Sequence, residues 1–137
     1  MNSRTYNDML TVIIVSFHSN LIIENLINVI EKNIKVLVIE NSLDKKLKID
    51  LEKKFENVQV IIPIKNLGNG AGINLGFSLV KTEFSLYLDV DTVPDKDMIN
   101  ILLENTKKIK NFSMLAPKVQ NFNYGEDLYI EHNNNKK

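Results

Sequence analysis

Two aspartates that stand two residues apart, Asp89 and Asp91, are the strongest candidates for chemistry in this chain. They follow an apolar run, residues 84–88, that has the composition of a buried strand. If the strand conformation continues, both carboxylates point to the same side of the sheet. Such a pair of oxygen ligands suits Mg²⁺ or Mn²⁺, and a cation would relieve the repulsion between the two charges. The alternative is a turn in which an aspartate or Thr92 caps the next helix.

A glycine-rich segment is the second candidate. Its glycines stand at positions 68, 70, 72 and 76, and apolar residues follow at helical spacing. The dinucleotide fingerprint G-x-G-x-x-G would follow the first strand and would need a glycine where Ile73 stands, and the phosphate loop G-x-x-x-x-G-K-[ST] does not occur. The segment therefore predicts either a flexible loop and a helix start packed closely on the sheet, or backbone brought close to a ligand.

The elements that must position these residues alternate between strands and helices. Buried strands are predicted at residues 11–16, 35–40, 58–62 and 84–88, with a fifth at 113–119. Helices are expected between them, the first capped by Ser19 or Asn20, and another is expected after Asp91 with Pro94 in its first turn. This order is typical of an α/β fold with a mostly parallel, Rossmann-like sheet and helices on both faces. Ligands of such sheets bind outside the carboxyl ends of the strands.

Composition excludes several classes of function. The 17 basic and 17 acidic residues cancel, so the basic excess of non-specific nucleic-acid binders is missing and no nucleic-acid partner is expected. A chain without cysteine has no disulfide scaffold and no thiolate chemistry. No apolar run approaches the roughly 18 to 20 residues that span a bilayer. We therefore expect a cytoplasmic protein, with peripheral contact at the inner face of the cell membrane as the alternative.

Taken in order, the motifs resemble those of family 2 glycosyltransferases with the GT-A fold, over about residues 10–118. Four segments carry the resemblance: residues 15–19 (VSFHS), 38–42 (VIENS), 66–76 (NLGNGAGINLG) and 86–92 (LYLDVDT). They resemble the family's first-strand ending, its V-V-D-N-S turn, its N-x-G segment and its metal-binding D-x-D strand end. The resemblance implies a nucleotide-sugar-binding GT-A domain at residues 10–122, between an N-terminal extension (1–9) and a polar tail (123–137).

The resemblance also implies a role for each matching residue. Ser16 and Phe17 would lie against the nucleotide base, and Glu40 would hold the base or the ribose, where the family has aspartate. The other residues of the nucleotide pocket would be Asn66, Gly68, Asn74 and Asp89. Asp89 and Asp91 would coordinate a divalent cation, Mn²⁺ or Mg²⁺, that bridges the diphosphate. The segment after Asp91 shows no family pattern for a general base, so no catalytic residue is assigned.

The implied reaction is transfer of a sugar, such as a hexose or rhamnose, from a UDP-, GDP- or dTDP-linked donor. The acceptor would be a hydroxyl of a glycan or a lipid-linked molecule, in the synthesis of a surface polysaccharide. The alternative is a truncated, non-catalytic nucleotide-binding fragment, or half of a split enzyme, completed by a partner chain or by a homo-oligomer. A metal-dependent nucleotidyltransferase is a weaker rival, because residues 16–20 lack the glycine-rich and basic loop of such enzymes.

Overall fold

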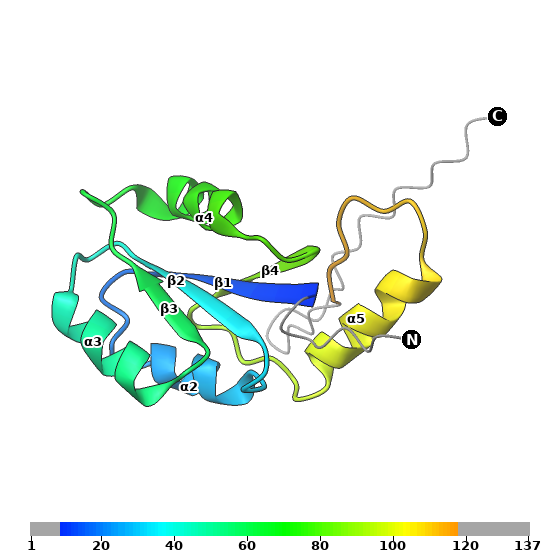
Figure 1. The fold of residues 1–137 in the computed structure, drawn as a ribbon, viewed down its shortest axis with the longest axis horizontal. Coiled ribbons are helices and arrows are strands. Elements are labelled where there is room, and N and C mark those ends of the chain that lie inside the picture. Colours follow the sequence, from blue (N-terminus) through cyan, green and yellow to red (C-terminus); the bar gives the residue numbers. More distant parts are fainter. Residues whose placement is uncertain (1–8, 118–137) are drawn as a thin grey trace, which may run out of the picture. The chain divides into compact units, whose positions relative to one another are not determined.

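The structure is a computed structural model that describes residues 9–117. The chain groups into two compact units that divide between Lys96 and Asp97. The first unit contains a four-stranded sheet in the order β3-β2-β1-β4 (Figure 1). Its elements are, in chain order, β1 (Leu10–Ser16), α2 (Ile23–Val29), β2 (Lys35–Glu40), α3 (Lys45–Lys54), β3 (Val58–Ile61), α4 (Gly68–Leu79) and β4 (Phe84–Asp89). All pairings are parallel, which confirms the predicted α/β fold with a parallel sheet.

β1 is the centre of the sheet, since it pairs with both β2 and β4. All seven of its residues are buried, as a run rich in β-branched residues and covered on both faces requires. The register places Ser16 beside Glu40 and Val15 beside Asp89. The carboxyl ends of β1, β2 and β4 therefore meet at one edge of the sheet.

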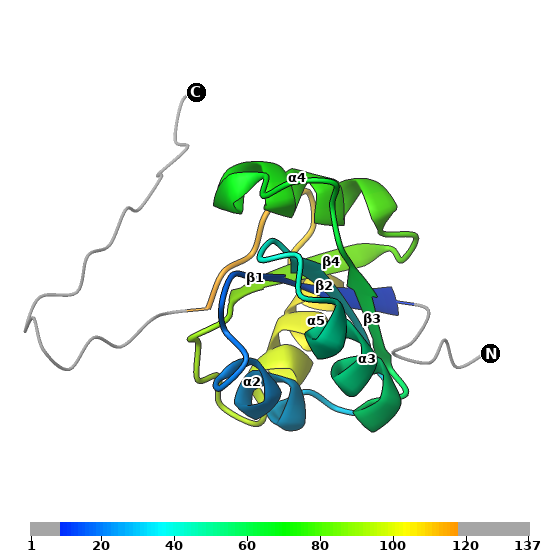
Figure 2. The same cartoon turned by 90° about the vertical axis from the view of Figure 1, so that its left-hand side faces the viewer.

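Helices cover both faces of this sheet: α2 and α3 lie on one face and α4 lies on the other (Figures 1 and 2). The helices α2 and α3 bury apolar stripes, whose members are Ile23, Leu26, Ile27, Leu47 and Leu51. In α4 the buried residues are instead Gly72 and Gly76. Because a glycine has no side chain, the backbone of α4 approaches Ile13 and Val15 of β1 closely.

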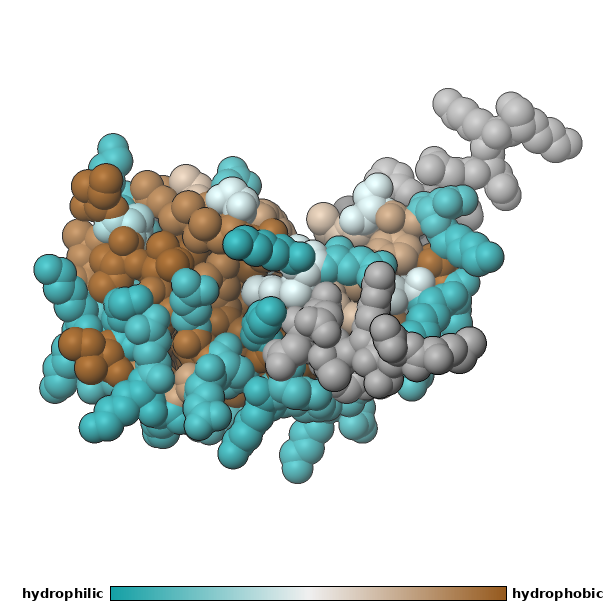
Figure 3. Space-filling view, in the orientation of Figure 1, coloured by the Kyte–Doolittle hydropathy of each residue, from teal (hydrophilic) through white to brown (hydrophobic). Residues whose placement is uncertain are grey.

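Apolar side chains remain at the surface over β3 and α4 (Figure 3). Exposed apolar residues of this part of the chain include Ile64, Phe77 and Leu79. Partly buried Ile61, Ile73 and Tyr87 pack beneath them against a cluster of Val15, Leu37 and Ile39. The α4 face of the sheet is therefore held by a thin apolar layer under a single helix.

The first helix is not capped as the sequence predicts. α2 begins at Ile23, and no side chain caps it. The carbonyl of Ser19 accepts hydrogen bonds from the backbone N–H groups of Ile22 and Ile23, both at 3.0 Å. The Ser19 hydroxyl donates to the carbonyl of Phe17 instead, a local bond that competes with capping.

Two predictions after Asp91 are also wrong. Pro94 does not lie in the first turn of a helix, because α5 (Met98–Lys108), in the second unit, begins only after Asp97. Proline suits extended and turn positions as well as a helix start, so its presence did not fix the boundary. Residues 113–117 form no strand, and Pro117 lacks the N–H that a sheet ladder needs. Residues 118–119 lie outside the described residues. Within residues 9–117, no helix is long and apolar enough to cross a membrane.

Candidate functional site

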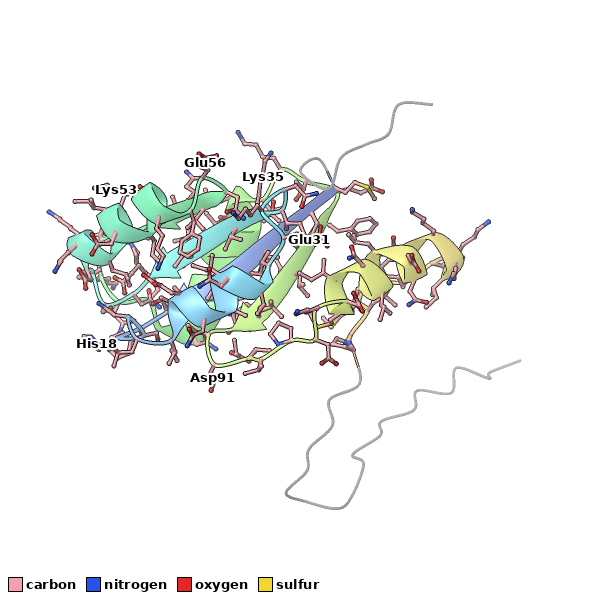
Figure 4. All side chains as sticks on the ribbon, turned by 90° about the horizontal axis from the view of Figure 1, so that it is seen from below. His18, Glu31, Lys35, Lys53, Glu56 and Asp91 are labelled. Atoms are coloured by element: carbon pink, nitrogen blue, oxygen red, sulfur yellow. The ribbon has the colours of Figure 1, made fainter. Side chains whose placement is uncertain are left out.

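The polar residues singled out in the sequence gather at the edge where β1, β2 and β4 end. Figure 4 places His18 and Asp91 at this end of the sheet and Lys35 and Glu56 at the opposite end. The loops after β1 and β2 and the turn after β4 therefore contribute side chains to the same edge, as the rule for parallel sheets predicts.

The loops that follow β1 and β2 are joined by hydrogen bonds. The backbone N–H of Asn41 donates to the carbonyl of Ser16 at 2.8 Å, which extends the sheet by one residue. The backbone N–H of His18, a residue in the left-handed region at φ 52°, donates to the hydroxyl of Ser42 at 3.1 Å. The amide of Asn20 donates to a carboxylate oxygen of Asp44 at 2.9 Å. These bonds fix the two loops to each other.

The carboxylate of Glu40 lies inside the protein and holds the turn that follows it. Glu40 is fully buried. Its Oε1 accepts from the backbone N–H of Ser42 at 3.1 Å and from the Ser42 hydroxyl. Its Oε2 accepts from the backbone N–H of Asp44 at 2.7 Å. Both oxygens of Glu40 are thus engaged by the turn, and a direct contact with a base or ribose stays a prediction.

Ser16 lies beside Glu40 and is also fully buried. Among the described residues its hydroxyl oxygen has no hydrogen-bond partner. Ile13 and Val15 face α4, so alternation along β1 turns Ser16 toward the face that α2 and α3 cover. The structure brings Ser16 and Glu40 together, but beneath the surface of the edge.

Phe17 is the aromatic residue that the edge exposes. Its side chain is 53% exposed, and its ring lies 4.3 Å from the ring of His18, centroid to centroid, with the planes tilted by 59°. An accessible aromatic face at this position is able to stack on a planar ligand.

Asn41 is a residue of the site that the sequence analysis treated only as part of a motif. It is 2% exposed, and its side chain joins the end of β2 to the start of α4. Its Nδ2 donates to the carbonyl of Gly68 at 3.0 Å, and its Oδ1 accepts from the N–H of Leu67 at 3.3 Å. A short amide directly after a buried strand was the available signal, because a buried amide must find partners.

The predicted residues of the glycine-rich segment separate into two groups. Asn66 and Gly68 form the loop that enters α4, where Asn66 Oδ1 accepts from the N–H of Gly68 at 2.8 Å and Gly68 has a positive φ of 74°. Asn74 lies two residues from both Gly72 and Gly76 on α4, so it faces away from the sheet and is exposed. The structure does not bring Asn74 to that loop, and its role in a nucleotide pocket stays a prediction.

Asp89 and Asp91 are both exposed, at the end of β4 and in the turn that follows. The backbone N–H of Thr92 donates to the carbonyl of Asp89 at 2.9 Å and closes this turn. Asp89 Oδ1 accepts from the hydroxyl of Tyr87 at 2.6 Å. Burial, together with this bond to Asp89, raises the pKa of Tyr87 above its ordinary value.

The donor set at this turn suits a cation that takes few protein ligands. Within residues 9–117, no group of three or more His, Cys, Asp or Glu side chains is arranged to hold a metal ion. Mg²⁺ is commonly bound by one or two carboxylates and completes its shell with water and phosphate oxygens. An exposed pair such as Asp89 and Asp91 fits that mode of binding and does not fit an all-protein metal cage.

Comparison with known proteins identifies the family. The pattern described as "Glycosyl transferase family 2" matches residues 11–136, whereas no curated protein matches the chain. The fold is similar to the crystal structure of S. aureus TarS 1-349, with a TM-score of 0.63 and 23% identity. The similarity covers 73% of this chain and 32% of that one, so the chain spans about a third of the length of that structure. On the family pattern, which covers most of its length, the chain belongs to glycosyl transferase family 2.

Proposed function

We propose that this glycosyltransferase module binds a nucleoside-diphosphate sugar at the carboxyl edge of its sheet. A divalent cation, Mn²⁺ or Mg²⁺, would be held there by Asp89 and Asp91. The observation that carries the proposal is the exposed pair of carboxylates at the end of β4. Two neighbouring carboxylates at a strand end repel each other, and a cation shared with a diphosphate would relieve that repulsion.

The other residues of the edge would bind and orient the donor. The exposed ring of Phe17 would stack on the base. The side chain of Asn41 bonds to Leu67 and Gly68 at the start of α4. There, backbone N–H groups of the glycine-rich segment would come close to the donor. When bound, the cation supplies charge stabilisation for the departing nucleoside diphosphate. The proposed acceptor is a hydroxyl of a glycan or a lipid-linked molecule.

The donor site is tested by calorimetric titration of UDP into the purified chain, with and without Mn²⁺. We expect binding that needs Mn²⁺ and that is lost in Asp91→Ala. Asp50→Ala is the matched control, because Asp50 is an exposed aspartate on α3, and its binding curve should equal that of the wild type. GDP and dTDP, titrated in the same way, identify the base that is preferred. A folded chain that binds none of the three nucleotides would contradict the proposal.

Sugar transfer is a separate measurement on the same preparation. Release of nucleoside diphosphate from the matching nucleotide sugar, with a mixture of glycan and lipid-linked acceptors, reports turnover. Binding without turnover would favour a nucleotide-binding module that needs a partner chain for the acceptor.

A further inference from the structure

One tyrosine joins the two elements that flank the candidate site. Tyr87 lies on β4, and its ring packs on the cluster of Val15, Leu37 and Ile39 under α4. Its hydroxyl lies 2.6 Å from Asp89 Oδ1 and 3.2 Å from Oδ1 of Asn69, in the first turn of α4. The phenol therefore stands between the aspartate at the end of β4 and the start of the glycine-rich helix.

The two contacts of the hydroxyl differ in kind. A phenol has one proton to donate, and 2.6 Å is the length typical of an O–H···O⁻ bond to a charged carboxylate. The proton therefore belongs to the bond with Asp89. If the amide of Asn69 is turned so that its N–H₂ faces the phenol, Asn69 donates to the phenol oxygen, and one hydroxyl serves both neighbours.

Asp89 is exposed, so its side chain would otherwise sample several rotamers. In the part of the chain that the structure describes, Tyr87 is the side chain that bonds to the Asp89 carboxylate. With Oδ1 held, the carboxylate keeps one orientation, and Oδ2 is the oxygen left for a ligand. A group fixed before binding loses less conformational entropy when the ligand arrives.

We infer that Tyr87 is a positioning residue, whose hydroxyl orients the Asp89 carboxylate for the divalent cation and couples it to the start of α4. This inference rests on the proposed function, since it assigns Tyr87 to the same site. The ring alone serves the packing under α4, whereas the hydroxyl alone makes the two polar contacts. Removing only the hydroxyl therefore separates the positioning role from a structural one.

The test is a double-mutant cycle on Mn²⁺-dependent UDP binding, measured with the wild-type chain, Tyr87→Phe, Asp89→Ala and the double variant. We expect Tyr87→Phe to weaken binding by about threefold to tenfold, the range for one hydrogen bond. In the Asp89→Ala background the same change should have no further effect, because the oxygen that accepts from the Tyr87 hydroxyl is already gone. Ser78→Ala is the control: it also removes one hydroxyl, which donates to the carbonyl of Leu75 within α4, at the end of the helix away from Gly68.

The outcomes distinguish this inference from the proposed function. A wild-type chain that binds UDP with Mn²⁺, together with a Tyr87→Phe variant of equal affinity, would overturn the positioning role and leave the donor site standing. Equal weakening by Tyr87→Phe with and without the Asp89 carboxylate would also overturn it, because the tyrosine would then act by another route. A folded wild-type chain that fails to bind UDP with Mn²⁺ would contradict both the positioning role and the proposed function.

Discussion

The carboxylate of Glu40 replaces water as the hydrogen-bond partner of the turn that follows β2. A buried charge is costly unless donors surround it, and Glu40 receives two backbone N–H groups and one hydroxyl, all from Ser42 and Asp44. Through the hydroxyl of Ser42 the same network reaches the backbone of His18. One acid therefore supports both loops at the carboxyl edge of the sheet.

Glu40→Gln should destabilise the protein by about 1–3 kcal/mol, because an amide N–H₂ would face backbone donors that lose their acceptor in the interior. Urea unfolding at neutral pH measures this loss. Glu104→Gln, the same substitution at an exposed position of α5, should change the stability by no more than about 0.5 kcal/mol. If Glu40→Gln is as stable as the control, the carboxylate does not support the turn and is free for a ligand.

Asp44 shows the effect of a charge at a helix start. Asp44 caps α3. The hydrogen bond from the backbone N–H of Leu47 has the largest effect in lowering the pKa of Asp44, and the bond from the amide of Asn20 lowers it further. Burial has the opposite effect, and the pKa is lowered overall. A group with a depressed pKa stabilises the folded state above its ordinary pKa, and that contribution is lost as the pH falls through the folded pKa.

Asp44→Asn keeps the capping oxygen but removes the titration. We expect this variant to be less stable than the wild type at neutral pH and to lose stability less steeply between about pH 5 and pH 2. Urea midpoints over this pH range measure the difference. Parallel curves for the two proteins would show that the charge of Asp44 does not contribute to folding.

At the scale of the elements, the packing of α4 on the sheet depends on which of its glycines face β1. A Cβ added at Gly76 would lie 2.5 Å from Cγ2 of Ile13, which is fully buried, so something must shift. A Cβ added at Gly70 meets nothing within 4 Å. The two positions share one helix and differ only in what they face.

Gly76→Ala should therefore cost about 1–3 kcal/mol, because overpacking outweighs the better helix propensity of alanine. Gly70→Ala should stabilise the protein by up to about 1 kcal/mol, since only the propensity changes. Thermal unfolding of the two variants and the wild type measures the expected loss of stability and the expected gain. A neutral Gly76→Ala would mean that α4 does not pack on β1 as closely as the structure has it.

The outer edge of the sheet at β3 is closed by a pair of side chains from α3. The N–H of Val60 donates to Glu52 Oε1 at 2.8 Å, and the ammonium of Lys48 donates to the carbonyl of Val60. Although burial raises the pKa of Glu52, the bonds from Lys48 and Val60 lower it overall. Strands at the edge of a sheet otherwise offer free backbone groups to other chains, so this pair protects the β3 edge.

The order of the elements could be predicted because their sequence signals are local. β-branched runs marked the strands, and apolar residues at helical spacing marked α2 and α3. The rule for parallel sheets then predicted the edge that holds Asp89. The rule does not say which face of the sheet a side chain lies on. Because side chains alternate along β1 and β2, Ser16 and Glu40 point into the interior.

The sequence did not indicate which residues from distant segments would come into contact. Asn41 and Leu67, or Tyr87 and Asn69, meet only because α4 packs closely on the sheet. That approach depends on Gly72 and Gly76, whose spacing in the sequence suited a helix packed on the sheet but also suited backbone close to a ligand.

At the scale of the whole molecule, every residue proposed to bind the donor, from Ser16 to Asp91, lies in the first of the two units. A ligand that binds only the folded state stabilises it by mass action, by about 2.7 kcal/mol at a concentration one hundred times its Kd. For a unit of this size we expect an increase in the thermal midpoint of roughly 10–20 °C. The increase should need UDP and Mn²⁺ together, because in the proposed site two exposed carboxylates would hold the cation and the diphosphate would complete its shell.

This prediction is checked by thermal melts with UDP, with Mn²⁺ and with both, on the wild type and on Asp91→Ala. The combined increase should exceed the sum of the separate ones in the wild type and should vanish in the variant. Hydrogen exchange on the same samples locates the effect, and added protection should concentrate in peptides of residues 9–96. An equal increase with Mn²⁺ alone in both proteins would place the cation elsewhere on the protein, because the Asp89–Asp91 pair would then contribute nothing to its binding.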